Sequence, residues 1–162
     1  MKFTTLAALA LALLGSGAAF GHGEKSHAPK AKRAISTEET AFGREGDPKK
    51  VTRSIGVDMN DTMRFSPSTL EVKRGEVVRF QVKNSGKVMH EMVLGTMQEL
   101  KEHAELMRKH PGMEHDEPYM AHVAPGKTER IVWHFTRVGE FYYGCLVPGH
   151  FEAGMIGRIV VR

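Results

Sequence analysis

Hydrophobic and polar residues alternate with a period of two along several short stretches from residue 51 onward. In residues 77–82 every second side chain is Val or Phe, and the side chains between them include Arg79 and Gln81. This period indicates β-strands with one buried face. We expect strands at residues 51–59, 70–72, 77–82, 91–94, 131–135, 141–145 and 157–161. Gly- and Pro-containing turn signals separate them, so the pattern predicts an antiparallel β-sandwich.

One stretch follows a helical period instead. Met97, Leu100, Ala104 and Met107 are spaced as on one face of a helix, and Pro111 lies just beyond them. A helix over residues 97–109 is therefore expected between two strands, because proline cannot continue a helix. Residues 110–122 are expected to form a loop. The predicted fold is all-β with one inserted helix.

The first 21 residues have the character of an export signal. Lys2 precedes an apolar run at residues 6–14, and small residues follow at 15–19. The run is shorter than the roughly 20 residues that span a bilayer. We therefore expect cleavage, a periplasmic product and no stable membrane insertion.

Residues 22–50 are rich in Lys, Glu, Ala, Gly and Ser, and they contain few large apolar side chains. Such a segment buries too little surface to offset its ordering entropy, so it is expected to be a flexible leader. The domain is predicted to span residues 51–162. Basic and acidic residues are interleaved and the net charge is only +4, which argues against nucleic-acid binding. The expected protein is a monomer.

The unusual counts among the 162 residues are 10 Met, 9 His and a single Cys. Thioether, thiolate and imidazole are the donors that copper prefers. A lone cysteine in an oxidising compartment is a liability unless it is buried, bound to metal or paired with another chain. The composition therefore favours a copper-binding protein.

The strongest motif is a Cys-x4-His-x4-Met loop formed by Cys145, His150 and Met155. Pro148, Gly149 and Gly154 allow a tight turn that could gather these side chains. Two His, one Cys and a weakly bound axial Met form the trigonal site of electron-transfer copper proteins.

The fourth ligand must come from elsewhere in the chain. His90 is the best candidate, because it follows the Asn84-Ser85-Gly86 turn and begins an expected strand. His122 and His134 are the alternatives. His134 has the opposite parity to Trp133, so it is expected to face solvent.

These motifs resemble those of the cupredoxins, the blue-copper family that includes azurin, plastocyanin and rusticyanin. The loop spacing is similar to that of rusticyanin, and the helix after His90 is similar to an insert in azurin. The resemblance covers residues 51–162. It implies a Greek-key β-sandwich holding one type 1 copper per chain, with His90, Cys145, His150 and Met155 as ligands.

A second set of soft donors surrounds the expected helix. A weaker copper patch is predicted from Met92, His110, Met113, His115, Met120 and His122. Such a patch resembles the Met/His-rich segments of periplasmic copper-tolerance cupredoxins. It favours copper tolerance and homeostasis as the function.

The alternative function is electron transfer between respiratory protein partners. A multicopper enzyme is disfavoured, because the sequence contains no His-x-His segment. A thiol enzyme with Cys145 as nucleophile and His150 as base lacks an evident third residue to orient the base, and leaves Met155 without a role. We expect no catalytic site.

Overall fold

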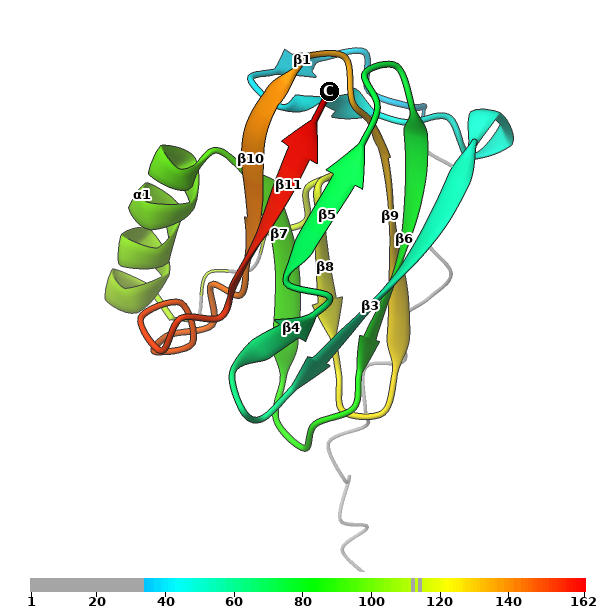
Figure 1. The fold of residues 1–162 in the computed structure, drawn as a ribbon. Coiled ribbons are helices and arrows are strands. Elements are labelled where there is room, and N and C mark those ends of the chain that lie inside the picture. Colours follow the sequence, from blue (N-terminus) through cyan, green and yellow to red (C-terminus); the bar gives the residue numbers. More distant parts are fainter. Residues whose placement is uncertain (1–33, 112, 114) are drawn as a thin grey trace, which may run out of the picture. The chain divides into compact units, whose positions relative to one another are not determined.

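The computed structural model describes residues 34–111, 113 and 115–162. They form two β-sheets and a helix (Figure 1). The first sheet has the order β1 (Glu39–Thr40), β2 (Gly43–Glu45), β9 (Thr128–His134), β6 (Val77–Asn84), β3 (Arg53–Asn60) and β4 (Arg64–Ser66). The second has the order β5 (Thr69–Val72), β11 (Ile156–Val161), β10 (Gly139–Gly144), β7 (His90–Gly95) and β8 (Met120–Val123). A short 3-10 helix, η1, covers Pro48–Lys50. The predicted all-β sandwich with one inserted helix is confirmed. Its expected antiparallel pairing is wrong in two places, because β3 pairs with β6 and β5 pairs with β11 in parallel.

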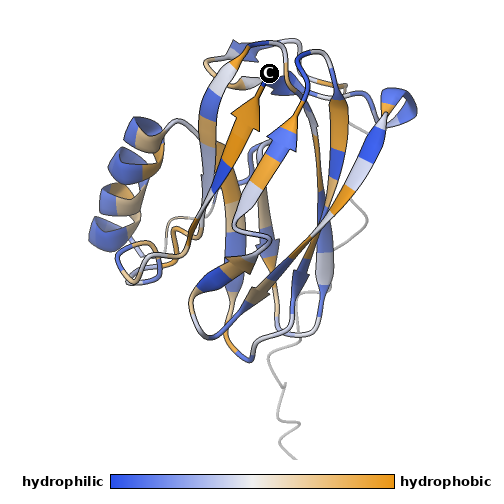
Figure 2. Ribbon diagram, in the orientation of Figure 1, coloured by the Kyte–Doolittle hydropathy of each residue, from blue (hydrophilic) through white to orange (hydrophobic). Residues whose placement is uncertain are grey.

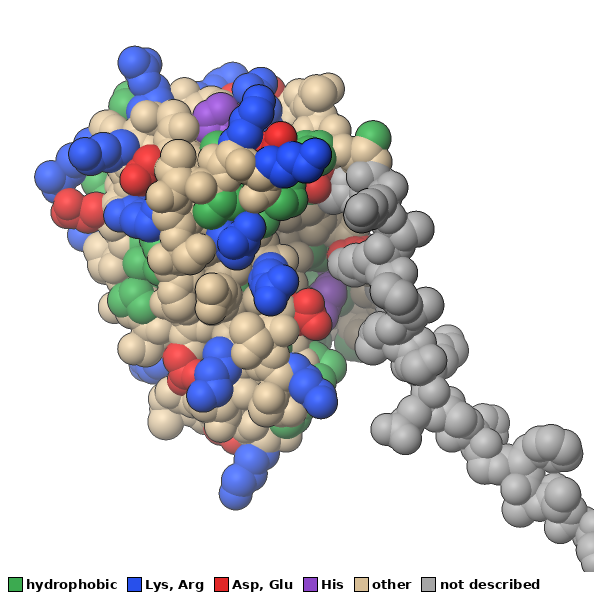
Figure 3. All heavy atoms as spheres, turned by 90° about the vertical axis from the view of Figure 1, so that its right-hand side faces the viewer, with side chains coloured by type: hydrophobic (Ala, Val, Ile, Leu, Met, Phe, Trp, Pro, Cys, Tyr) green, Lys and Arg blue, Asp and Glu red, His purple; other side chains and the backbone are tan. Residues whose placement is uncertain are grey.

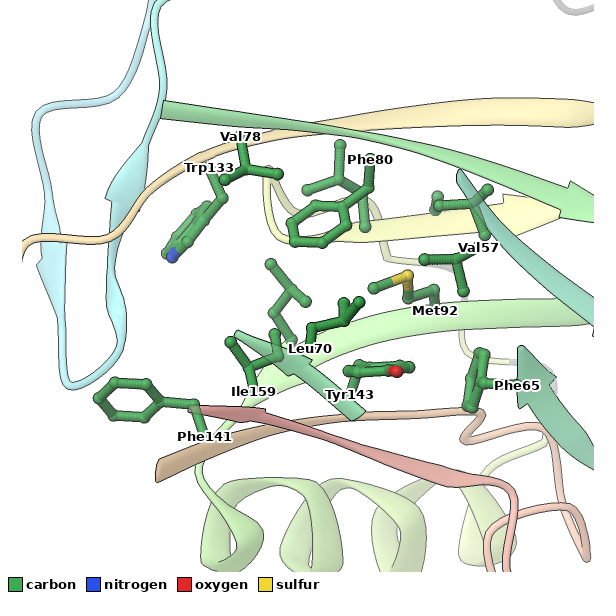
Figure 4. Packing of buried hydrophobic residues seen from close by; sticks show 14 of the residues in the cluster. Val57, Phe65, Leu70, Val78, Phe80, Met92, Trp133, Phe141, Tyr143 and Ile159 are labelled. Atoms are coloured by element: carbon green, nitrogen blue, oxygen red, sulfur yellow. The ribbon is translucent and has the colours of Figure 1, made fainter. Parts of the chain in front are cut away.

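The core lies between the two sheets and comes from the residues whose alternation predicted the strands. In β6, Val78, Phe80 and Val82 are fully buried, whereas Gln81 is exposed. The same two-residue alternation of apolar and polar positions is visible along the strands in Figure 2. Figure 4 shows how side chains from both sheets meet in this core, with Phe80 and Trp133 on one side and Tyr143 and Ile159 on the other.

The helix α1 spans Met97–Lys109, as the sequence predicts. Thr96 and Glu99 form a reciprocal capping box, which satisfies backbone donors at the start of the helix. Leu100, Ala104 and Met107 are buried. They pack with residues of the second sheet and of the loop that follows β10 in a second, smaller apolar cluster. The helix therefore covers the side of the second sheet that faces away from the main core.

The leader predicted over residues 22–50 is wrong for its last part. The compact unit begins at Ala34, and β1 and β2 form a hairpin whose second strand pairs with β9. Phe42 is 4% exposed and stacks on Trp133 at a ring-centroid distance of 5.1 Å. One aromatic side chain thus anchors a segment whose average composition is polar. The predicted signal peptide and the start of the leader lie outside the described residues.

Two further strands escaped the sequence analysis. β4 covers three residues, and β8 begins within the predicted loop 110–122 and ends at Val123. Met120, Ala121 and Val123 of β8 are buried against β7, and only His122 is exposed. Four residues are too few for their alternation to stand out from a loop.

The face on the right of Figure 1 carries many charged side chains with hydrophobic ones between them. Figure 3 shows Lys and Arg side chains spread over this face with acidic groups among them. Within the described ranges, no helix has both the length and the apolar character needed to cross a bilayer.

The packing of Phe42 gives a test of where the folded unit begins. We expect Phe42→Ala to lower the free energy of unfolding by about 3 kcal/mol, because it removes a buried aromatic ring and leaves a cavity. The matched control is Ile35→Ala, since Ile35 is 42% exposed and its removal should cost under about 0.5 kcal/mol. Denaturant unfolding of the metal-free proteins measures both. Equal stability of the two variants would contradict the packing.

Candidate metal centre

Strand ends from both sheets meet at one end of the sandwich. The loop after β6 leads into β7, which begins at His90. β10 ends at Gly144, directly before Cys145. Gly144 also pairs with Val93 of β7 and with Ile156 of β11. The register of three adjacent strands therefore fixes where Cys145 stands relative to His90.

The loop from Cys145 to Met155 is closed by its own backbone. The N–H of Cys145 donates to the carbonyl of Met155 over 3.1 Å, and the N–H of Met155 donates to the carbonyl of His150 over 3.1 Å. Gly149 and Gly154 have φ values of +88° and +86°, in the region that disfavours other residues. The two glycines thus permit the tight turns predicted from the sequence.

The turn before His90 is held by a buried amide. Asn84 is fully buried, and its side-chain oxygen accepts from the N–H of Gly86 over 2.9 Å. Its Nδ2 donates to the carbonyls of Val88 and Val123, each over 2.8 Å. This side chain therefore joins the end of β6, the turn and β8, so that His90 starts from a fixed position.

Asp61 orients the ring of His90. Its Oδ1 lies 3.2 Å from Nε2 of His90, so Nδ1 is left to face Cys145. Gly86 makes this approach feasible, because a Cβ there would lie 2.1 Å from the same carboxylate oxygen. The N–H of Lys87, and more weakly that of Val88, hold the pKa of Asp61 below its usual value, so the carboxylate stays charged. A carboxylate behind a histidine is the usual partner of a metal-binding imidazole.

Three donor atoms converge in front of these supports. Sγ of Cys145 lies 3.9 Å from Nδ1 of His90 and 3.3 Å from Nδ1 of His150. The ligand atoms of all three residues lie within 4.8 Å of one another. His90 and Cys145 have no solvent exposure, whereas His150 is partly exposed. The group is therefore buried on two sides and reaches solvent through one imidazole edge.

Burial sets the protonation of the site. Desolvation raises the pKa of the Cys145 thiol to about 12, although the N–H of Glu91 donates to its sulfur over 3.4 Å and favours the thiolate. Desolvation also lowers the pKa of His150, and a neighbouring His90 acts in the same direction. A buried thiol beside a neutral imidazole fits a cation that takes the place of the thiol proton.

The predicted fourth residue, Met155, is fully buried in the same apolar cluster as Cys145. Of the alternatives to His90, His134 pairs with Val77 at the start of β6, the end of that strand away from Asn84. His122 lies opposite Glu91 on β8 and forms an ion pair with that carboxylate. The structure thus brings His90, Cys145 and His150 together and leaves both alternatives outside.

Comparison with known proteins supports a copper site. The family model of copper-binding proteins of the plastocyanin/azurin type matches residues 51–162. This chain belongs to the plastocyanin/azurin family of copper-binding proteins. Thiolate and paired imidazoles are donors suited to that metal, so the residues present fit it.

Curated relatives of this cupredoxin carry the name copper-resistant cuproprotein CopI. The protein from Rubrivivax gelatinosus is 52% identical over 124 residues, which cover 76% of this chain and 75% of the relative. The protein from Pseudomonas aeruginosa is 34% identical and covers 75% of this chain and 83% of the relative.

Solved structures agree on the fold. Auracyanin B has a TM-score of 0.61 at 20% identity, covering 76% of this chain and 96% of its own. The reduced auracyanin from Roseiflexus castenholzii has a TM-score of 0.60 at 17% identity, covering 69% of this chain and 98% of its own.

The soft-donor patch predicted for this cupredoxin is only partly assembled. Met92 and Met120 are buried in the two apolar clusters, so their thioethers serve as packing. His110 and Met113 are exposed near the end of α1. His115 and His122 do approach each other, with ring centroids 5.9 Å apart.

Sequence reasoning missed the supporting groups Asp61 and Glu91. Asp61 lies 29 residues before the histidine that it orients, and no local pattern marks it. Glu91 sits in a strand of buried residues and is 3% exposed. A carboxylate inside an otherwise apolar strand is the one signal that could have drawn attention to it.

The raised pKa of the thiol predicts proton release on copper binding. At pH 7.5–9 the free Cys145 is protonated, so a copper ion held by its sulfur must displace that proton. The apparent affinity for copper should therefore rise about tenfold for each pH unit, through the displaced thiol proton of Cys145 alone. Calorimetry in buffers of different ionisation enthalpy measures the release. Cys145→Ser is the control, and it should release about one proton fewer per copper; equal release would contradict the assignment.

Proposed function

We propose that this cupredoxin binds one type 1 copper through His90, Cys145, His150 and Met155 and serves copper tolerance in the periplasm. The convergence of one thiol and two imidazoles within 4.8 Å is the observation that carries the proposal. The curated relatives, named as copper-resistant proteins, support the physiological role. Export through residues 1–21 is part of the proposal and can be read from the N-terminal residue of the mature protein.

Each ligand has a distinct role. The Cys145 thiolate supplies the strongest bond and, with its proton lost, balances part of the charge of the cation. The imidazoles of His90 and His150 bind both Cu(I) and Cu(II), while the Met155 thioether binds copper weakly. When bound, copper gives the centre its redox activity. The chain contributes a preset geometry, because hydrogen bonds hold the loop and Asp61 holds the ring of His90.

The proposal assigns no catalytic role to the protein. Four protein donors around one ion leave no coordination position for a substrate, whereas catalytic metal sites keep one open. A centre of this type would hold its copper, release it, or exchange one electron with a redox partner. That capacity suits a protein that limits the copper available to damage other periplasmic proteins.

Electron transfer is the second candidate, and the partial exposure of His150 favours it. A partly exposed ligand edge gives an electron a short path from the buried centre to a docked redox partner. The same edge also gives copper an entry route, so exposure alone does not separate the two functions. The two functions differ instead in what loss of the protein would do to the cell.

The ligand assignment predicts the spectrum of variants. Adding Cu(II) to the metal-free protein should give an intense visible thiolate-to-copper absorption, and Cys145→Ser should reduce it at least tenfold. Met155→Leu should keep the absorption and raise the reduction potential, because a donor to Cu(II) is lost. His134→Gln is the matched control, since it changes a histidine away from the centre. An undiminished band in Cys145→Ser would exclude the assignment.

The physiological proposal predicts the phenotype of a deletion strain. Growth should fail at copper concentrations that the parent tolerates, and respiration without added copper should be unchanged. Complementation should succeed with the wild-type chain and His134→Gln and fail with Cys145→Ser. A respiratory defect at low copper, with normal copper tolerance, would instead establish the electron carrier.

A further inference from the structure

A second group of imidazoles lies on the other face of the strand that carries His90. Successive residues of a strand point to opposite faces, so His90 faces the main core and Glu91 faces the helix side. His122 of β8 is directly opposite Glu91. His103 of α1 and His115 of the following segment complete the group. Their ring centroids are 4.5 Å apart for His103 and His115 and 5.9 Å apart for His115 and His122.

These separations suit a shared cation. The rings of His90 and His150, at the primary centre, are 4.9 Å apart, which lies between the two values. With metal–nitrogen bonds of about 2.0 Å, two imidazoles on one ion have ring centres roughly 4.5–6 Å apart, depending on the bond angle. The two measured separations fall in this range, although among the described residues only the donor atoms of His90, Cys145 and His150 already lie within 4.8 Å of one another. Rotation of the imidazole rings is therefore needed to bring the outer nitrogens onto a single ion.

His115 presents a free donor atom. Its Nδ1 lies 3.4 Å from the carbonyl of Met113, which can only accept, so Nδ1 carries the proton. Its Nε2 is buried and has no hydrogen-bond partner in the described part of the chain. An unprotonated imidazole nitrogen, shielded from water and without a partner, is available to bind a metal ion.

His122 is hydrogen-bonded to a carboxylate, as histidines that bind metals commonly are. Its Nδ1 lies 2.9 Å from Oε2 of Glu91, while Oε1 of the same carboxylate accepts from the N–H of Leu146 over 2.8 Å. A carboxylate that receives one ring N–H fixes the ring and leaves the other nitrogen for the metal. That nitrogen, Nε2, now donates to the carbonyl of His115 over 3.1 Å. Metal binding exchanges this hydrogen bond and its proton for a bond to the ion.

His103 supplies the third imidazole. Desolvation lowers its pKa, and the neighbouring His115 acts in the same direction, so the ring is neutral at pH 7. A small cavity of about 120 Å³ borders His103 and Glu99, so the ring is not tightly packed on every side. The helix face that presents His103 also buries Leu100 and Met107, so its position is fixed.

We infer that His103, His115 and His122 form a second cation site, oriented by Glu91, that takes Cu(II) with lower affinity than the primary centre. Three imidazoles without a thiolate suit a divalent ion of intermediate softness, and Cu(II) binds such donors most tightly among the common first-row metals. Only the identity of the ion rests on the proposed function. The site would let one chain hold two copper ions during copper excess.

The experiment compares copper content and spectra of the full chain and its variants. Wild-type protein loaded with excess Cu(II) and desalted should hold one more copper per chain than the double variant His103→Gln/His115→Gln. That extra copper should show the electron paramagnetic resonance signal of a type 2 site with nitrogen ligands. His110→Gln, an exposed histidine between the two, is the matched control and should retain the wild-type content. Copper held elsewhere on the chain is common to all variants and cancels.

We expect that substitutions which remove one copper site leave the other intact. The double variant should keep the full visible absorption of the primary centre, which also shows that it is folded, while its second copper binds at least tenfold more weakly. Cys145→Ser should lose the visible absorption and keep the type 2 signal that depends on His103 and His115. If the double variant loses the visible absorption, the same copper content and spectra are measured on the single variant His115→Gln, and these results decide whether the second site exists. Copper content equal to that of wild type in these variants would overturn the second site.

Discussion

The hydrogen bond from the N–H of Cys145 to the carbonyl of Met155 closes the loop that carries Cys145 and His150, and the geometry of the candidate metal centre depends on it. It continues the pairing of β10 with β11, so the loop begins and ends on a rigid ladder. Because β10 also pairs with β7, the same ladder sets the distance from Cys145 to His90. The donors are therefore placed by backbone register before any metal arrives, and little rearrangement needs to accompany a change in oxidation state.

Glu91 joins the two sides of the sheet. Its backbone N–H donates to the sulfur of Cys145, and its carboxylate holds both Leu146 and His122. A carboxylate that is 3% exposed is costly unless it is paired, and here both oxygens have partners. The charge also opposes ionisation of the neighbouring thiol. Glu91 thus disfavours the thiolate of Cys145 when no metal is bound, and it orients the ring of His122. It therefore connects the primary centre to the histidine group beside the helix.

Much of the fold follows from local pattern, whereas the supports of the site do not. The period of two in β6 and the capped, amphipathic helix were predictable because burial of one face repeats along the chain. The approach of Cys145 to His150 was predictable, because the two residues lie five positions apart in one short glycine-containing loop. Phe42, Asp61 and His103 were missed, since each acts through a contact with a distant segment. Met92 and Met120 were predicted as copper donors but pack in the core, because a thioether that could bind copper packs equally well among apolar side chains.

The central claim is that one thiolate and two imidazoles hold the copper of this cupredoxin. X-ray absorption spectroscopy at the copper edge, on protein loaded with one copper per chain, tests it most directly. The account predicts one short copper–sulfur bond together with scattering from two imidazole rings. A first shell of nitrogen and oxygen alone, with no short bond to sulfur, would contradict it.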